Sequence, residues 1–194
     1  MRGNEAIAGA VSSSMADLPS SPRATSMAGN ARSTRHLRLG VVLLTLSMFG
    51  CDHATKLAAE QALTNGRAVS VVSGVLELRF TTNDDTAFSL LHNLGVARPP
   101  MLLAAVSALA LVAVVAMWMA ARKRASRAQH VGFALVLAGA LGNVVDRALR
   151  GSVIDFIHVT HWPIFNVADV AVVAGSIVLG LCAVLRRAKP EARA

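Results

Sequence analysis

The sequence is poor in charged and aromatic residues. Only 15% of its 194 residues are Asp, Glu, Lys or Arg, only 4% are aromatic, and tyrosine is absent, while 54% are hydrophobic. A soluble domain of this length has too little interior for so much apolar surface, so the composition excludes an ordinary globular protein and indicates a membrane protein. Cys51 and Cys182 lie far apart in apolar runs, which excludes a zinc-finger spacing and a disulfide framework.

Common catalytic signatures are also missing. The sequence contains no H-E-x-x-H pair and no G-x-S-x-G elbow. The histidines His53, His92, His158 and His161 match no metal-ligand pattern, so we expect neither a metal nor another cofactor. The net charge of +8 does not indicate a nucleic-acid partner, because the basic residues form short clusters between apolar runs, where they act as topology signals.

Four apolar segments are long enough to cross a membrane. They cover about residues 37–59, 101–121, 131–149 and 167–185, close to the roughly 20 residues that a hydrocarbon core requires. Residues 69–80 are rich in valine and partly alternating, which predicts one or two short strands on the membrane surface. We therefore expect an α-helical membrane protein with four transmembrane helices and a small external β-rich segment.

The two ends of the chain differ from this apolar region. Residues 1–36 are rich in Ser, Ala, Gly and Arg without an apolar period, so we expect a disordered N-terminal extension. Residues 37–187 form the predicted four-helix membrane domain. Residues 188–194 form a short predicted cytoplasmic tail.

Basic clusters assign an orientation to the four spans. One cluster precedes the first span, one fills the loop between the second and third, and one follows the fourth. Their members are Arg32, Arg35, Arg38, Arg122, Lys123, Arg124, Arg127, Arg186, Arg187, Lys189 and Arg193. In a four-span chain these regions share one side, which the positive-inside rule makes cytoplasmic. We expect a multi-pass inner-membrane protein with both termini in the cytoplasm.

Polar residues beside the apolar segments gather at the opposite, periplasmic face. A charged group within a span costs roughly 2.5–3.5 kcal/mol on insertion scales, so each one calls for a structural or functional reason. Asp52 and Lys56 are four residues apart on one helix face and predict an ion pair at the end of the first span. Asp146 is adjacent to Arg147, and this pair is able to hold the end of the third span.

Asp155 and Asp169 have two interpretations. Taken alone, Asp169 resembles the N3 residue of a capping box, with Asn166 as the N-cap of the fourth span. However, Pro163 breaks the chain between the two aspartates, so a short loop can fold them toward each other. Two close carboxylates cannot both ionise cheaply, so one keeps a proton while the other accepts one from water. Such a pair meets the requirement for peptide hydrolysis without a covalent nucleophile.

The polar clusters resemble those of the lipoprotein signal peptidase (signal peptidase II) family over roughly residues 37–187. The similar motifs are Asp52-x-x-Thr55-Lys56, Gly142-Asn143-x-x-Asp146-Arg147, Val153-x-Asp155-Phe156 and Phe165-Asn166-x-Ala168-Asp169. The resemblance implies an aspartic endopeptidase that removes the signal peptide from diacylglyceryl-modified bacterial prolipoproteins, with membrane lipids as its surroundings.

The resemblance also implies roles for individual residues. The family's catalytic pair falls on Asp155 and Asp169, and residues 68–80 would supply a short sheet that cradles the substrate. The supporting and substrate-binding positions would be Asp52, Lys56, Asn83, Asn143, Asp146, Arg147 and Asn166.

One position departs from the family pattern. The family motif Asn-x-Gly-x-Ala-Phe occurs here as Asn83-Asp84-Asp85-Thr86-Ala87-Phe88, with Asp85 in place of the glycine. A side chain and a negative charge at this position predict a different turn beside the substrate path and an altered substrate preference.

A second functional class stays open from the residues alone. Acids in membrane proteins also form proton relays, so Asp146, Asp155 and Asp169 are compatible with a non-catalytic membrane scaffold or a small proton-coupled transporter. A relay is expected to distribute acids near the middle of the bilayer. These acids instead lie at one predicted interface, which favours a surface-facing active site.

The predicted orientation is open to a direct test. We expect reporter fusions after Arg127 and Arg187 to be cytoplasmic and fusions near Gly74 and His161 to be periplasmic, because the three basic clusters share one side. Paired alkaline phosphatase and fluorescent-protein fusions measure the side of each point. A periplasmic reporter after Arg127 would contradict the four-span arrangement.

Overall fold

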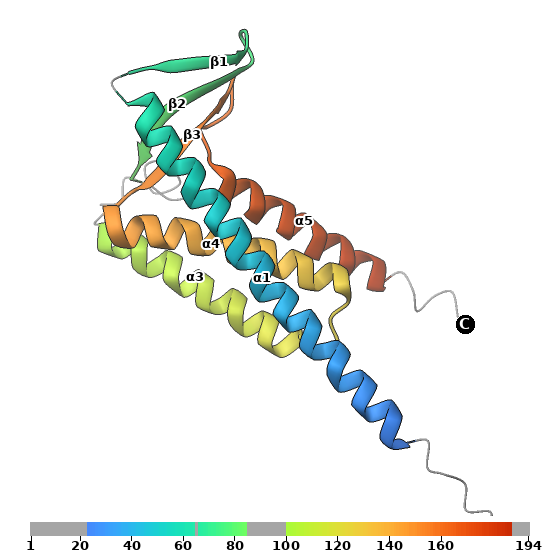
Figure 1. The fold of residues 1–194 in the computed structure, drawn as a ribbon. Helices are drawn as coiled ribbons and strands as arrows, with labels where there is room; N and C mark the ends of the chain where they lie inside the picture. The colour runs from blue at the N-terminus through green and yellow to red at the C-terminus, as the bar shows by residue number, and fades with distance from the viewer. Residues whose placement is uncertain (1–22, 65, 85–99, 188–194) are drawn as a thin grey trace, which may run out of the picture. The chain divides into compact units, whose positions relative to one another are not determined.

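The computed structural model describes residues 23–64, 66–84 and 100–187, with side chains described from residue 36. Met1–Arg35 and His36–Ala194 are separate compact units, and α1 belongs to the second unit from His36 onward. The elements, in chain order, are α1 (Arg23–Leu63), β1 (Ala68–Val72), β2 (Leu76–Asn83), α3 (Pro100–Ala121), α4 (Arg127–Arg150), β3 (Val153–Val159) and α5 (Val167–Arg187) (Figure 1). The expected extension, residues 1–36, and tail, residues 188–194, stay predictions.

Four of the described helices are long and apolar enough to cross a membrane, which confirms the predicted spans. The spanning segments are His36–Leu63, Met101–Ala121, Arg127–Arg150 and Val167–Arg186. The third begins earlier than its hydropathy alone predicts because a capping box starts the helix. Ser126 Oγ accepts a hydrogen bond from the Gln129 backbone N–H, and the Gln129 side chain accepts one from the Ser126 N–H.

α4 is the central helix, packed against both α3 and α5 (Figure 1). Its contact with α5 is close because both helices place glycines in the contact. A Cβ at Gly139 would overlap the carbonyl oxygen of Ala168, and a Cβ at Gly175 would lie 2.6 Å from the carbonyl oxygen of Gly132. Small residues at these positions allow the two backbones to approach each other, as is common between membrane helices.

The three strands form an antiparallel sheet in the order β1-β2-β3. β1 and β2 confirm the strands predicted in residues 69–80, and Gly74 turns between them with φ of 71°. β3 supplies a third strand beyond the one or two that the sequence predicts. It pairs with β2 from Leu76 opposite Val159 to Asn83 opposite Val153. Because β3 connects α4 to α5, the sheet is attached to both of these helices.

A small hydrophobic core joins the sheet to the end of α1. Ile154 and Phe156 of β3 pack with Ala59 and Leu63 of α1. Asp155 lies between them in the strand, so its side chain points to the opposite face. The alternation seen in the sequence therefore directs one face of β3 toward α1 and turns the carboxylate away from that core.

Candidate active site

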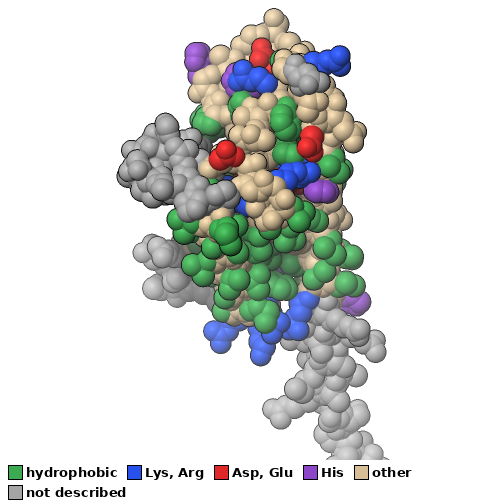
Figure 2. All heavy atoms as spheres, turned by 90° about the vertical axis from the view of Figure 1, so that its left-hand side faces the viewer, with side chains coloured by type: hydrophobic (Ala, Val, Ile, Leu, Met, Phe, Trp, Pro, Cys, Tyr) green, Lys and Arg blue, Asp and Glu red, His purple; other side chains and the backbone are tan. Residues whose placement is uncertain are grey.

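One end of the visible face carries acidic and basic side chains, and the other end carries basic ones. In Figure 2, Asp and Glu side chains lie, together with several Lys and Arg side chains, on the sheet side of a belt of hydrophobic side chains, and a further group of Lys and Arg side chains lies at the other edge of that belt. The elements explain this separation, because α4 carries Arg127 at its first residue and Asp146 in its last two turns, whereas α5 carries Asp169 in its first turn. The acidic residues considered below thus collect at the sheet end.

The ammonium group of Lys56 is fully buried among acceptors from two helices. Its Nζ lies 2.7 Å from Asp52 Oδ2 and 2.8 Å from Asp146 Oδ2, and it donates to Asn143 Oδ1 at 3.2 Å. An ammonium has three N–H donors, so these three acceptors satisfy all of them. The predicted pair of Asp52 with Lys56 is confirmed, and it is part of a larger cluster.

Asp146 makes its second ion pair with Arg150, one turn further along α4. Arg150 Nη1 lies 2.9 Å from Asp146 Oδ1, and Nη2 lies 3.3 Å from Glu60 Oε2 on α1. Neighbouring residues on a helix point about 100° apart, whereas residues four apart share a face. Arg150 and Glu60 thus extend the link between α4 and α1, and the sequence analysis missed both.

Asp52 reaches α5 as well as Lys56. Its Oδ1 accepts a hydrogen bond from the backbone N–H of Ala168 at 2.9 Å. This approach requires a glycine on α4, since a Cβ at Gly142 would lie 2.5 Å from Asp52 Oδ2. The glycine of the Gly142-Asn143 motif therefore has a steric role.

Asn166 connects the two candidate catalytic aspartates. Its Nδ2 donates to Asp155 Oδ1 at 2.6 Å, and its Oδ1 accepts from the Asp169 backbone N–H at 2.9 Å. Its own backbone N–H donates to Asp169 Oδ2 at 3.2 Å. The last two bonds are the reciprocal pair of a capping box at the start of α5. Helix capping and alignment of the two acids are therefore carried out by the same residues.

Two further asparagines hold the remaining carboxylate oxygens. Asn83 Nδ2 donates to Asp155 Oδ2 at 2.8 Å, and Asn143 Nδ2 donates to Asp169 Oδ1 at 2.9 Å. The Asn143 amide is oriented by Lys56, because its Oδ1 faces the ammonium and only its NH₂ group is left for Asp169. Each of the four carboxylate oxygens thus accepts at least one hydrogen bond.

The two aspartates differ in their surroundings. Asp155 is 2% exposed, whereas Asp169 is half-buried. Burial raises the pKa of Asp155 to about 6, the negative charge of Asp169 adds to the increase, and the hydrogen bonds from Asn83 and Asn166 oppose it. Asp155 is therefore suited to hold a proton up to about pH 6, well above the range of an ordinary aspartate, while Asp169 has access to solvent.

The structure brings together eight of the nine predicted site residues, either directly around Asp155 and Asp169 or in the Lys56 cluster beside them. The role of Arg147 on α4 stays a prediction. Asp85 and residues 86–88 lie outside the described residues. Within the described part of the chain, no group of three or more His, Cys, Asp and Glu side chains is arranged to hold a metal ion.

Comparison with known proteins identifies the family. The family model for signal peptidase (SPase) II matches residues 44–185, which is more than half of the chain. The chain belongs to the signal peptidase II family. The lipoprotein signal peptidase of Geobacter metallireducens is 37% identical over 136 residues, covering 67% of this chain and 81% of that protein. The lipoprotein signal peptidase of Mycolicibacterium smegmatis is 35% identical over 155 residues, covering 77% of this chain and 62% of that protein.

Solved structures agree with this assignment. Two structures described as a bacterial membrane enzyme superpose with TM-scores of 0.66 and 0.64 at 26% and 25% identity. The matches cover 77% and 74% of this chain and 90% and 91% of those chains. The resemblance stated from the four motifs is thereby confirmed at the level of family and fold, and the chain is a membrane-embedded protease.

The Lys56 cluster predicts a large loss of stability when its cation is removed. Lys56→Met leaves Asp52 and Asp146 buried without the ammonium that compensates them. Breaking a buried pair in this way costs about 3–5 kcal/mol, so we expect a lower Tm in detergent and less folded protein in the membrane. Thermal unfolding of the purified protein measures the effect.

A second substitution separates charge from packing. Adding Asp52→Asn to Lys56→Met removes one uncompensated carboxylate, and we expect it to restore part of the lost Tm. Lys123→Met, at an exposed lysine outside the cluster, serves as the matched control and is expected to leave Tm unchanged. A Lys56→Met protein as stable as the unmodified chain would show that the cluster contributes nothing to the fold.

Proposed function

We propose that this protein is an aspartic endopeptidase that removes the signal peptide from diacylglyceryl-modified bacterial prolipoproteins. Membership of the signal peptidase II family supports the reaction, and relatives described as lipoprotein signal peptidases support the substrate class. The observation that carries the catalytic assignment is the pair formed by Asp155 and Asp169 through Asn166. Neither the fold nor the relatives favour a scaffold or a proton-coupled transporter.

The two aspartates divide the proton transfers between them. Asp169, ionised and open to solvent, takes a proton from a water molecule as its oxygen attacks the scissile carbonyl carbon. Asp155, protonated, donates to the carbonyl oxygen, where negative charge develops. As the carbon–nitrogen bond breaks, the proton taken by Asp169 passes to the leaving amine, and a hydroxyl group of the tetrahedral intermediate returns a proton to Asp155 as the new carboxyl group forms. Asn83, Asn143 and Asn166 keep both carboxyl groups from rotating during these steps.

We further propose that this reaction occurs at the periplasmic face of the inner membrane, with both termini in the cytoplasm. With a rise of 1.5 Å per residue, Asp146 lies about 28 Å along α4 from Arg127, close to the roughly 30 Å of a hydrocarbon core. The acidic and basic ends of the helices thus match the two membrane surfaces. A substrate anchored by its diacylglyceryl group would present its cleavage site at this level, beside β2 and β3.

Complementation tests the proposal. We expect the chain to restore growth and prolipoprotein processing in a host depleted of its own lipoprotein signal peptidase. Asp155→Asn and Asp169→Asn are each expected to abolish processing without lowering the amount of inserted protein, because an amide cannot transfer the required protons. Accumulation of uncleaved, lipid-modified prolipoprotein on immunoblots is the measurement.

Three controls define the result. Lys123→Gln, at an exposed residue far from the aspartates, is expected to process normally. Asp146→Asn is expected to lose activity partly or to lose folded protein, since it pairs with Lys56. Processing in isolated membranes is expected to survive a chelator. If Asp146→Asn were stable but inactive while Asp155→Asn kept near-normal turnover, the wrong acids would have been paired.

The raised pKa of Asp155 predicts the pH dependence of cleavage. Below about pH 6 this carboxyl keeps its proton, and above it both acids are charged, so kcat/KM is expected to fall as pH rises through about 6. Asn83→Ala removes a hydrogen bond that lowers the pKa of Asp155, so the alkaline limb should move to higher pH. Initial rates on a synthetic diacylglyceryl lipopeptide measure both profiles.

Gln129→Ala is the comparison for this experiment, because it removes an amide from the far end of α4. Its pH profile is expected to match that of the unmodified chain. An alkaline limb that moves to lower pH in Asn83→Ala would contradict the assignment of Asp155 as the protonated partner.

A further inference from the structure

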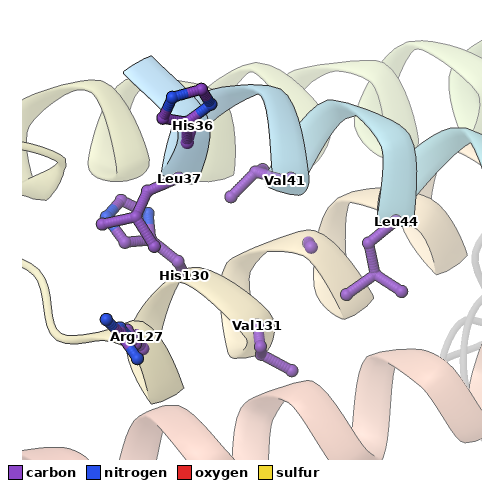
Figure 3. Close-up of a pocket in the computed structure, with 9 residues that line it drawn as sticks. His36, Leu37, Val41, Leu44, Arg127, His130 and Val131 are labelled. Atoms are coloured by element: carbon purple, nitrogen blue, oxygen red, sulfur yellow. The ribbon is translucent and has the colours of Figure 1, made fainter. Parts of the chain in front are cut away.

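An apolar pocket of about 300 Å³ opens between α1 and α4 at the end of these helices far from the aspartates (Figure 3). Val41 and Leu44 of α1 and Val131 of α4 line its apolar part. Figure 3 shows His36, His130 and Arg127 gathered at its other end. The volume is at the lower limit of small-molecule sites, which run from roughly 300 to 1,000 Å³.

His130 places a polar donor in the wall of this pocket. The residue is 4% exposed, and its Nδ1 accepts a hydrogen bond from Trp118 Nε1 at 3.2 Å. An indole nitrogen only donates, so in the neutral imidazole the proton is on Nε2. Trp118 thus fixes the tautomer in which His130 offers an N–H to an acceptor.

Two further arginines at this end of the molecule have a side-chain donor without an acceptor. The Nε atoms of Arg38 and Arg122 are buried, and neither has a hydrogen-bond partner. Arg38 lies two residues after the pocket residue His36 on α1, and Arg122 lies one turn after Trp118. Neither arginine lines the pocket itself, so both add positive charge beside it and no direct contact to a ligand.

Protein carboxylates do not balance this charge within the described residues. Every described acidic residue belongs to the sheet end of the molecule. These residues are Asp52, Glu60, Glu77, Asp84, Asp146, Asp155 and Asp169. The basic end, which we define as Arg38, Arg122, Lys123, Arg124, Arg127 and Arg186, therefore has positive charge that calls for an external anion.

We propose that this pocket binds an anionic phospholipid of the surrounding bilayer, with an acyl chain against Val41, Leu44 and Val131 and its phosphate at His36, His130 and Arg127. The apolar wall favours a lipid over a soluble anion. Arg127 also begins a membrane-spanning helix, so the phosphate lies at the level of the lipid headgroups, where basic residues attract anionic lipids. The lipid joins α1 to α4 at the end that Lys56 does not reach. The inference is independent of the proposed protease chemistry.

Lipid titration of the purified, delipidated full chain tests the proposal. Phosphatidylglycerol is the probe, and phosphatidylcholine and inorganic phosphate are the comparators. We expect phosphatidylglycerol to bind saturably with one tightly held molecule by native mass spectrometry and to raise Tm. The two comparators are expected to do neither.

Two variants address the two halves of the site. His36→Ala with Arg127→Ala removes the exposed phosphate contacts, and a loss of at least about fivefold in affinity is expected, because an arginine at the lipid surface contributes about 1 kcal/mol and a tenfold change corresponds to about 1.4 kcal/mol. Gly40→Leu blocks the apolar groove without a clash, since nothing lies within 4 Å of a Cβ at that position. It is expected to reduce binding similarly.

Two control variants repeat the loss of a basic residue and the exchange of a glycine for leucine at positions outside the pocket. Lys123→Ala changes a basic-end residue, and Gly180→Leu changes an equally open glycine on α5; both are expected to bind like the unmodified chain. If the double variant has a lower lipid-free Tm, Arg127→Gln replaces it. The proposal would be overturned if phosphatidylcholine bound as tightly as phosphatidylglycerol or if inorganic phosphate alone raised Tm. It would also be overturned if Lys123→Ala lost as much affinity as the double variant, or if Gly40→Leu bound phosphatidylglycerol like the unmodified chain.

Discussion

Burying an ammonium group is costly unless other oxygens replace the water that hydrates it. Lys56 contacts three such oxygens, which belong to two helices. Asp52 belongs to α1, whereas Asn143 and Asp146 belong to α4, so the buried charge fixes how these helices meet. The same charge orients the Asn143 amide and thereby directs its NH₂ group to Asp169. The alignment of a proposed catalytic acid thus depends on a cation that takes no part in the reaction.

This arrangement suits a protein whose helices are surrounded by lipid. Apolar side chains gain little by moving from lipid to a helix–helix contact, so close packing and hydrogen bonds must hold the helices together. In the described part of the chain, α4 is held by close backbone packing on one side and by polar contacts on the other. Toward α5, Gly139 and Gly175 allow the backbones to touch. Toward α1, the Lys56 cluster and the bond from Thr45 to the Ala134 carbonyl connect the helices.

Features local to one segment could be predicted from the sequence. Hydropathy and length locate the four spans, and spacings of four and three residues predict the Asp52–Lys56 pair and the capping box of Asn166 with Asp169. Contacts between segments could not be predicted in the same way. Lys56 and Asp146 are 90 positions apart, and the pairing of β2 with β3 depends on how the chain returns through α3 and α4. Arg150 shares a helix face with Asp146, but the adjacent Arg147 is equally basic, and the sequence alone does not decide between the two partners.

The contact between Gly142 and Asp52 has a consequence for the way loss-of-function data on this family are interpreted. A single added methyl group at Gly142 would press on the Asp52 carboxylate and, through it, disturb Lys56 and Asn143. A library screened only for lost processing would therefore rank this position with Asp155 and Asp169, although a glycine has no side chain with which to do chemistry. In such a screen, a position is intolerant to substitution either because it lies near the buried charge of Lys56 or because it lies near the bond that is cut.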